Sequence, residues 1–456
     1  MLVYRKKMKD IFKNINFTKI TIPQRRADLY SRARLNNLLS DLLQYQLVIL
    51  IAPVGYGKTS LLIDVAHQTS IPFCWYSVDS HHQNLHHFIA HVIAAIGKVF
   101  LEFGQQSLKL LYETKNRIDI EQMIKCLADE IDKHIVEEFV FIFDDFHLVE
   151  TNDQVSHFVN QMIQHIGPKC HIVIASHNLV ALDNLPFLIA QAKVKGIDFE
   201  EIAFQADELQ AFVQQNYPIT IPRAEVEALA KSMEGWAMGL VLVTFNSKPG
   251  YIISRLRKAQ TTGRGLYYQL AELFLEQLPA EIQEFLLYTS PFEAVSVERC
   301  QKVWANIEYP GDPDWAKYIT MALEKVPFIT AIKYNRHFWL SYHYIFRQFL
   351  YFRFTQQYPD AEQPILERLA YIYTEEGLWD EAYDLYHRLN DVRGIIHLIE
   401  QGGVTLIQQG RRLTLAGWIK ALPTYIVEAT PSLRLLLNLI NHTSVGANGV
   451  YSSTNN

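Results

Sequence analysis

A short stretch around residue 55 contains the residue types that bind a polyphosphate. An unbroken apolar run at residues 47–51 is followed by Gly55 and Gly57, and then by Lys58 and Thr59. Glycines let the backbone turn its N–H groups toward phosphate oxygens, the lysine supplies a positive charge, and the threonine hydroxyl binds Mg²⁺. A helix is expected to start here, and its N-terminal dipole also favours an anion. The pattern predicts a triphosphate site, against the alternative of a plain glycine turn, that consists of Ala52, Pro53, Val54, Gly55, Tyr56, Gly57, Lys58, Thr59 and Ser60.

Two neighbouring carboxylates follow a second apolar run. Residues 140–143 are apolar and precede Asp144 and Asp145. An acid at the end of a strand beside a phosphate-binding loop holds Mg²⁺, directly or through water, so we expect Thr59 and Asp144 to be the magnesium ligands. Asp145 is expected to polarise an attacking water or to hold the loop after the strand. We therefore assign catalytic roles to Lys58, Asp144 and Asp145, and the alternative is a strand followed by an acidic turn.

The apolar runs also indicate the fold that positions these residues. Residues 47–51, 140–143 and 171–176 read as buried strands, and residues 60–66 and 153–166 read as helices. Strands that alternate with helices form a parallel sheet, which binds phosphate at the carboxyl ends of its strands. We therefore expect an α/β nucleotide-binding domain of the P-loop NTPase type.

The composition is typical of a globular protein with several domains. The chain has 456 residues, of which 49% are hydrophobic and 20% are charged, and this length suits three or four domains. No apolar run reaches the length of about 18 residues that spans a bilayer. The formal net charge of −6 gives no electrostatic reason for nucleic-acid binding. The four cysteines have no paired spacing, so neither a zinc site nor a disulfide framework is expected, and the expected location is cytoplasmic.

Four motifs follow one another in an order that is similar to one family of regulators. They are residues 53–59 (Pro-Val-Gly-Tyr-Gly-Lys-Thr), 75–79 (Trp-Tyr-Ser-Val-Asp), 142–147 (Ile-Phe-Asp-Asp-Phe-His) and 235–240 (Gly-Trp-Ala-Met-Gly-Leu). Arg32 and residues 342–346 are further matches. The chain thus resembles MalT-like signal-transduction ATPases of the STAND class over nearly its whole length. Full-length members of that family often end in a LuxR-type DNA-binding domain.

The resemblance implies a switch rather than a fast enzyme. ADP would hold a closed monomer, and ATP together with an inducer would open it for self-association. A helical lid near the adenine is implied at residues 235–240. The nucleotide contacts implied outside the phosphate loop are Arg32, His177, Gly235 and His343. For His343 the alternative is packing in a core among its aromatic neighbours.

Position 177 departs from the family pattern. Where the family usually has Ser-Arg at the end of the third strand, this chain has Ser176 and His177. An arginine there is a permanent charge that senses the terminal phosphate, whereas histidine is shorter and largely neutral at pH 7. We therefore expect weak sensing of the γ-phosphate and slow or absent ATP hydrolysis.

A histidine-rich stretch occupies residues 81–91. The pairs His82/His86 and His87/His91 have the i,i+4 spacing that places two zinc ligands on one helix face. No cysteine or suitably spaced acid accompanies them. We therefore expect a solvated helix start in preference to a zinc site.

The remainder of the chain divides into further domains. Residues 205–245 read as lid helices, and residues 254–264 as a mobile basic linker, with a nucleic-acid patch as the alternative. Helices with a short strand pair at 328–332 and 337–341 suit a winged helix that packs against protein. Beyond residue 360, helical hairpins resemble tetratricopeptide repeats. The expected parts are an N-terminal extension at 1–22, the P-loop domain at 23–200, the helical lid at 201–250, the winged-helix-like domain at 251–358, the repeats at 359–440 and a disordered tail at 441–456.

The sequence supports one function and leaves two alternatives open. We expect an ATP- or ADP-binding, Mg²⁺-dependent switch of a MalT-like transcriptional regulator, which hydrolyses ATP slowly and self-associates as a homo-oligomer when nucleotide binds. Its partner would be an unknown small-molecule or protein inducer that binds the repeats, with no membrane contact. No helix-turn-helix pattern follows the repeats, so direct DNA binding by this chain is not expected. It is either the N-terminal part of a longer regulator or acts without a DNA reader of its own. The alternatives are an active P-loop NTPase, for mechanical work or phosphoryl transfer, and a degenerate scaffold that binds proteins through its repeats.

Overall fold

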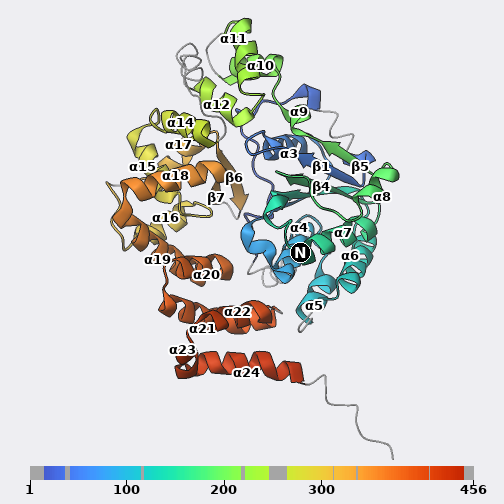
Figure 1. The fold of residues 1–456 in the computed structure, drawn as a ribbon, viewed down its shortest axis with the longest axis vertical. Helices are drawn as coiled ribbons and strands as arrows, with labels where there is room; N and C mark the ends of the chain where they lie inside the picture. The colour runs from blue at the N-terminus through green and yellow to red at the C-terminus, as the bar shows by residue number, and fades with distance from the viewer. Residues whose placement is uncertain are drawn as a thin grey trace, which may run out of the picture.

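The computed structural model divides into four parts. The residues that it describes are 15–35, 42–113, 118–216, 221–245, 264–311, 313–334, 337–409 and 411–445. Figure 1 shows a nucleotide-binding domain beside a winged-helix domain, with lid helices above and helical repeats below. None of the described helices is long and apolar enough to cross a membrane. The predicted basic linker lies outside the described residues except for Arg264.

Five parallel strands form the centre of the nucleotide-binding domain, in the order β2-β3-β4-β1-β5. Their alternate side chains enter two separate cores, which is why the strands are apolar on both faces. Helix α3 covers one face of the sheet, and helices α4 to α8 pack in the core on the other. The strands are β1 (Leu47–Ile51), β2 (Phe73–Ser77), β3 (Phe139–Asp144), β4 (Cys170–Ser176) and β5 (Val194–Ile197). The helices are α3 (Lys58–Gln68), α4 (Leu85–Val99), α5 (Gln105–Glu113), α6 (Ile120–His134), α7 (Asp153–His165) and α8 (Leu185–Ala190), with short 3₁₀ turns η1 (Ala33–Leu35), η2 (Ser80–Gln83) and η3 (Phe146–Leu148).

The strand order brings three chain segments to one edge of the sheet. Strand β4 lies between β1 and β3, with Ile51 in register with Ser176 and Phe143 in register with Ile174. Because the strands are parallel, the segments that follow β1, β3 and β4 all leave the sheet at the same edge. The prediction of an α/β P-loop domain with a parallel sheet is confirmed.

Within the described residues, four helices form the lid. They are α9 (Phe199–Ile202), α10 (Ala206–Asn216), α11 (Arg223–Ser232) and α12 (Ala237–Phe245). Apolar residues at helical spacing, such as Leu209 and Val213 on α10, enter a core shared with α11 and α12. The helices predicted within residues 205–245 are therefore present.

The winged-helix domain combines helices with one hairpin. Its helices are α14 (Arg264–Leu275), α15 (Ala280–Thr289), α16 (Val297–Trp304), α17 (Trp315–Lys325) and α18 (Tyr344–Gln357). The hairpin pairs β6 (Ile329–Tyr334) with β7 (His337–Tyr342) in antiparallel register, as predicted. Val295 adds a bridge to Leu340, and thereby joins the loop before α16 to the hairpin.

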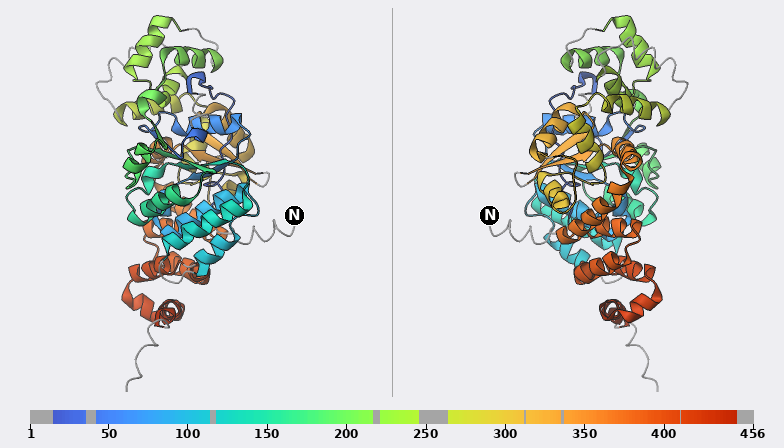
Figure 2. Two further views of the ribbon diagram at one scale, coloured as in Figure 1. Left: turned by 90° about the vertical axis from the view of Figure 1, so that its right-hand side faces the viewer. Right: turned by 90° about the vertical axis from the view of Figure 1, so that its left-hand side faces the viewer.

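Helical hairpins follow the winged-helix domain. They contain α19 (Pro359–Glu376), α20 (Trp379–Arg388), α21 (Val392–Gln408), α22 (Arg412–Ala421), α23 (Thr424–Ala429) and α24 (Pro431–Val445). Gly377 ends α19 with a φ of 76°, and Ala370 and Ala382 are fully buried, as expected where α19 and α20 pack closely. The views in Figure 2 place the last helices, in red, beneath the nucleotide-binding domain. The predicted tail begins too early, because α24 continues through residues 441–445; residues 446–456 lie outside the described residues.

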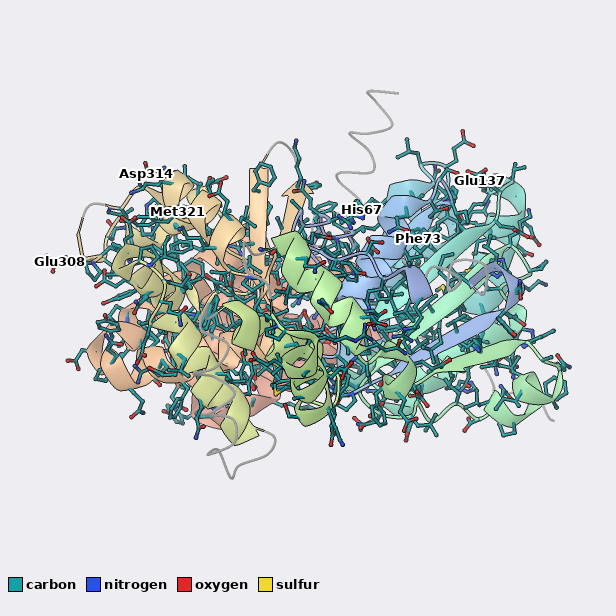
Figure 3. All side chains as sticks on the ribbon, turned by 90° about the horizontal axis from the view of Figure 1, so that it is seen from above. His67, Phe73, Glu137, Glu308, Asp314 and Met321 are labelled. Atoms are coloured by element: carbon teal, nitrogen blue, oxygen red, sulfur yellow. The ribbon has the colours of Figure 1, made fainter. Side chains whose placement is uncertain are left out.

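The winged-helix and nucleotide-binding domains lie side by side when seen from above (Figure 3). Glu308 and Met321 mark the outer side of the winged-helix domain, and Glu137 marks the far end of the nucleotide-binding domain. The sheet and the hairpin therefore belong to two separate bodies. Residues 15–35, which we call the N-terminal segment, connect them.

The N-terminal segment contacts the winged-helix domain along much of its length. The ring of Phe17 stacks on that of Tyr334 with centroids 4.3 Å apart. The amide of Gln24 donates to the carbonyl of Ala331 at 2.7 Å. We expected residues 1–22 to form an extension; the described part, from residue 15, is instead packed in the body of the protein. Residues 1–14 lie outside the described residues.

A cluster of charges lies where this segment meets both domains. Lys19 bonds Asp79, at the end of β2, at 2.7 Å and lies 3.7 Å from Glu293 of the winged-helix domain. Arg347 of α18 pairs with Glu293 at 2.7 Å. Burial alone would raise the pKa of Glu293, but the charges of Arg347 and Lys19 outweigh it and lower that pKa to about 2. The ionised carboxylate therefore stabilises the contact between the two domains.

The variant Glu293→Gln is expected to loosen this contact. A hydrogen bond to a charged group contributes about 1.5–3 kcal/mol, so local opening should become about tenfold or more frequent. Hydrogen exchange of the amides in residues 15–24 measures that opening. Folding lowers the pKa of Glu293. The stabilisation that ionised Glu293 gives to the contact between the domains is therefore complete above the ordinary glutamate pKa of 4.5, and it is lost as the pH falls toward 2. Glu298→Gln, at an exposed helical ion pair, is the control, and equal exchange in the two variants would contradict the prediction.

Candidate nucleotide-binding site

The phosphate loop connects β1 to the first turn of α3. Gly55 and Gly57 have φ angles of 84° and 91°, a region that only glycine enters without strain. Gly57 caps the N-terminus of α3, so the helix dipole and its unpaired amides face the loop. Lys58 is buried, and its ammonium donates to the carbonyls of Ala52 at 2.6 Å and Pro53 at 3.3 Å. The predicted loop geometry is thus present, with one buried cation inside it.

Thr59 and Asp144 meet at the predicted magnesium position. The Thr59 hydroxyl, in the first turn of α3, lies 3.1 Å and 3.0 Å from the two carboxylate oxygens of Asp144, at the end of β3, although β4 separates β3 from the strand that precedes the loop. Burial and the adjacent charge of Asp145 raise the pKa of Asp144 to about 8, against the opposing effects of Thr59 and Lys58. A hydroxyl and two neighbouring carboxylates are the oxygen donors that Mg²⁺ prefers, and a divalent cation would relieve the repulsion between the acids. The residues present therefore fit a magnesium ion.

Asp145 has a special backbone conformation. Its φ is 58°, which is uncommon for a residue with a side chain, and it begins the short turn η3. The turn directs the chain away from β3 immediately after the two acids. Such strain is frequent at functional sites, and a catalytic role for Asp145 stays a prediction.

The lid lies directly on the phosphate loop. The indole N–H of Trp236 donates to the carbonyl of Val54 at 2.9 Å, and the amide of Met238 donates to the carbonyl of Gly55 at 2.9 Å. A Cβ added to Gly55 would lie 2.5 Å from the Trp236 nitrogen. The resemblance implied that residues 235–240 lie near the adenine. In the structure this motif donates hydrogen bonds to the backbone of the phosphate loop.

Gly235 has a structural position in this arrangement. Its φ is 66°, and an added Cβ would lie 2.7 Å from both Ala203 and the backbone of Phe204. The carbonyl of Gly235 accepts from the amide of Phe204 at 3.0 Å. Gly235 thus lets the chain turn tightly so that Trp236 reaches the loop.

A pocket lies beside the loop, between the N-terminal segment, α3, the lid and the winged-helix domain. It has an empty volume of about 1000 Å³, part of which is open to solvent. Gly57 of the phosphate loop and Ser60 of α3 line it, and aromatic side chains contribute to its apolar lining. Its mainly apolar lining with a few polar groups suits a nucleoside. The residues that the sequence did not indicate there include Tyr30, Phe204, Phe212, Val241, Pro327 and Thr330.

Arg32 lines this pocket but is held mainly by the lid. Its guanidinium pairs with Glu208 of α10 at 2.7 Å, donates to the carbonyl of Ala203 at 2.9 Å and stacks on Phe204 at 4.3 Å. Arg34 also reaches Glu208, at 3.2 Å. The predicted nucleotide contact of Arg32 therefore remains a prediction, whereas its role in fixing the lid is visible in the structure.

Three histidines, His147, His177 and His343, lie near Lys58 of the phosphate loop. The rings of His147 and His177 are stacked with centroids 3.5 Å apart. Burial, together with the positive charge of Lys58, lowers the pKa of His177 to about 3. Burial also lowers the pKa of His343 to about 4, and its interactions with Asp145 and Lys58 place it near the same site. His177 is therefore neutral at pH 7 and lacks the permanent charge of an arginine.

The histidine-rich stretch differs from its prediction. His82, His86, His87 and His91 are all at least nine-tenths buried, so the expected solvated helix start is wrong. The prediction failed because it considered the helix alone, whereas helices of the repeats pack over this end of α4. The contact is visible in the bond of 3.0 Å from the Asn84 side chain to Thr414 of α22.

The fold and the site together define a class of protein. A five-stranded parallel sheet carries a phosphate loop, a carboxylate pair and a covering lid, and a winged-helix domain and helical hairpins follow. The described parts of the chain are thus those of the P-loop NTPase fold, followed by a winged-helix domain and helical hairpins.

Comparisons with known proteins agree with this class. The sequence model of the MalT winged helix domain matches residues 270–362. The transcriptional regulator MalT of Vibrio parahaemolyticus is 22% identical over 92% of this chain and 46% of its own length. The serine/threonine-protein kinase PknK of Mycobacterium tuberculosis is 23% identical over 91% of this chain and 37% of its own length. The chain thus spans less than half the length of these relatives.

One solved structure has a similar fold over almost the whole chain. It is a STAND protein with a tetratricopeptide repeat sensor, PH0952 from Pyrococcus horikoshii, with a TM-score of 0.65 and 15% identity over 93% of this chain and 57% of that one. The chain is therefore similar to MalT and has the fold of the STAND ATPases.

Proposed function

We propose that this chain is the nucleotide-dependent switch of a MalT-like transcriptional regulator. It binds ATP or ADP with Mg²⁺, hydrolyses ATP slowly if at all, and self-associates when ATP replaces ADP. The bond between the lid and the phosphate loop, from Trp236 to Val54, is the observation that supports this best. A bound nucleotide would contact the loop, the lid and the winged-helix domain together, because all three line one pocket. A change in the terminal phosphate would thereby alter how these parts pack.

The assigned roles follow from the chemistry of each group. The loop amides and Lys58 bind the phosphates, and Thr59 with Asp144 hold the Mg²⁺, which neutralises phosphate charge when bound. Asp145 is proposed to orient a water. The pocket between the N-terminal segment and the lid binds the nucleoside, and His343 lies near the phosphates from the winged-helix side.

The partners are proposed from the relatives and from the shape of the chain. Relatives that carry the name of MalT are described as helix-turn-helix regulators, so we propose that this switch regulates transcription without direct DNA contact by the described residues. The helical hairpins are proposed to bind an inducer, as a tetratricopeptide-like sensor. A cytoplasmic location is consistent with this role.

Nucleotide content and assembly state test the proposal together. Purified protein is denatured and its nucleotide identified, and size-exclusion chromatography with light scattering compares ADP with a slowly hydrolysed ATP analogue. Tightly held ADP and a larger assembly with the ATP analogue would support a switch. Rapid turnover would instead indicate an enzyme, and protein that neither carries nor binds nucleotide would indicate a scaffold.

The variant His177→Arg should strengthen recognition of ATP. A permanent charge replaces an imidazole that is neutral at pH 7, so the preference for ATP over ADP should rise by about tenfold, with faster hydrolysis. Equilibrium binding of the two nucleotides and steady-state phosphate release measure this. His165→Arg, at the end of α7, is the control. An unchanged preference and turnover in the His177 variant would show that this position does not limit phosphate sensing.

A further inference from the structure

Three buried histidines meet on the far side of the nucleotide-binding domain from the lid. His82 belongs to η2, and His87 and His91 lie one turn apart on α4; we call these three the histidine cluster. One ring nitrogen of each lies within 4.8 Å of one nitrogen of both others. The ring centroids are 4.4–5.0 Å apart. Two chain segments thus direct three potential metal ligands at one point.

Two ring nitrogens of the cluster are buried without a hydrogen-bond partner, and for His91 the bonds also show which nitrogen carries the proton. Nδ1 of His91 lies 3.0 Å from the carbonyl of His87, so it carries the proton and the Nε2 lone pair is left over. That Nε2 is buried, has no hydrogen-bond partner, and His91 is wholly inaccessible. Nδ1 of His87 is likewise buried and has no hydrogen-bond partner. Buried acceptors without donors are costly, and a metal ion satisfies them.

Two carboxylates approach the cluster from different elements. Nδ1 of His82 accepts from the backbone amide of Asp79 at 3.0 Å and lies 3.3 Å from Oδ1 of the same residue. Metal binding at Nε2 would move the proton of the neutral ring to Nδ1, where the Asp79 carboxylate can accept it, so we assign Nε2 as the ligand atom of His82. Oδ2 of Asp380, on α20 of the helical hairpins, lies 3.7 Å from Nδ1 of His87. Each carboxylate also has a cationic partner, namely Lys19 for Asp79 and Arg411 for Asp380. The acids therefore balance these cations and keep the surroundings close to neutral.

We propose that the histidine cluster binds one Zn²⁺-type divalent ion, with the carboxylate of Asp380 as its fourth ligand. Three imidazoles and a carboxylate suit the tetrahedral preference of zinc, whose nitrogen ligands lie at about 2.0–2.1 Å. Ligand nitrogens of a tetrahedral site are then about 3.3 Å apart, so the rings must approach by up to about 1.5 Å, which small side-chain rotations provide. The ion would join α4 of the nucleotide-binding domain to α20. It would therefore fasten the helical hairpins to the domain independently of nucleotide.

Titration of the metal-stripped full chain with Co²⁺ and Zn²⁺ tests the site. The wild type should bind one equivalent, with Co²⁺ giving the visible absorption of a tetrahedral nitrogen–oxygen site. His91→Gln should weaken binding by at least about tenfold. His86→Gln is the matched control, because His86 is equally buried on the same helix but bonds the carbonyl of Leu111 at 3.1 Å. No stoichiometric binding by the wild type, or equal weakening in the two variants, would overturn the proposal.

Two further variants make the test decisive. His177→Gln removes a member of the second group of potential ligands, Asp145, His147 and His177, at the nucleotide site. If His177→Gln lost the one bound metal ion while His91→Gln kept it, the proposal would be overturned. Asp380→Asn changes a side chain outside the core of the nucleotide-binding domain, so it also serves if His91→Gln does not fold. It should weaken Zn²⁺ binding and abolish metal-dependent protection of α20 from hydrogen exchange; unchanged affinity and protection would exclude Asp380 as a ligand.

Discussion

The variant Lys58→Ala is expected to bind ATP and ADP at least about 100-fold more weakly than the wild type. Lys58 is the buried cation of the phosphate loop, and its ammonium already lies against the loop carbonyls of Ala52 and Pro53. Burial lowers its pKa, against the opposing charges of Asp145 and Asp144, so a phosphate nearby would favour its charged form. Removal of one member of a buried charge pair costs about 2–5 kcal/mol, which corresponds to the predicted loss.

Isothermal titration with each nucleotide in the presence of Mg²⁺ measures this effect. Lys109→Ala is the control, because Lys109 is an exposed lysine on α5 with only a helical ion pair to Glu113. The control should bind as the wild type does. If Lys58→Ala kept its affinity while it remained folded, the assignment of the phosphate site would be wrong.

The variant Gly55→Ala is expected to separate the lid from the phosphate loop. Gly55 has a φ of 84°, and its new Cβ would lie 2.5 Å from the nitrogen of Trp236 and 2.9 Å from Cβ of Met238. The methyl group therefore combines backbone strain of about 1–2 kcal/mol with a clash at the two contacts that close the lid. We expect at least about a tenfold loss of nucleotide affinity and faster release of bound nucleotide.

Tryptophan fluorescence and the rate of nucleotide release report on the lid. Gly311→Ala is a matched control, since Gly311 has a φ of 89° but nothing within 4 Å of an added Cβ. It carries the same backbone strain without the clash, at a place remote from the loop. If both variants released nucleotide at the wild-type rate, closure of the lid would not depend on this contact.

The sequence predicted those parts of the site whose chemistry is local. The phosphate loop is one continuous stretch, and Asp144 is found at the end of an apolar run, so type and spacing sufficed for both. Parallel pairing then brought the third run between the other two strands, and His177 thereby reached the same edge. The alternation of apolar runs with helical segments also indicated the α/β fold.

The parts that were missed depend on contacts between distant segments. Glu208, the partner of Arg32, lies 176 positions away in the chain, and no local pattern connects them. The pocket lining comes from the N-terminal segment, the lid and the winged-helix domain at once. The burial of His91 likewise depends on packing by helices elsewhere in the chain. Periodicity reports which face of a helix is apolar, but not which later domain covers a polar one.

The N-terminal segment has a mechanical consequence for any switch built on this fold. Three residues of this segment each bond a different domain. Asn16 bonds Glu381 of the helical hairpins, and Arg26 bonds the carbonyl of Val326 in the winged-helix domain. Arg32 pairs with Glu208 of the lid. These anchors follow one another along the segment, so a displacement of one domain is passed to the next through the backbone between them. Cleavage of that backbone would leave the phosphate loop intact and remove this direct connection between the lid and the hairpins, while the core shared through the winged-helix domain would still join them.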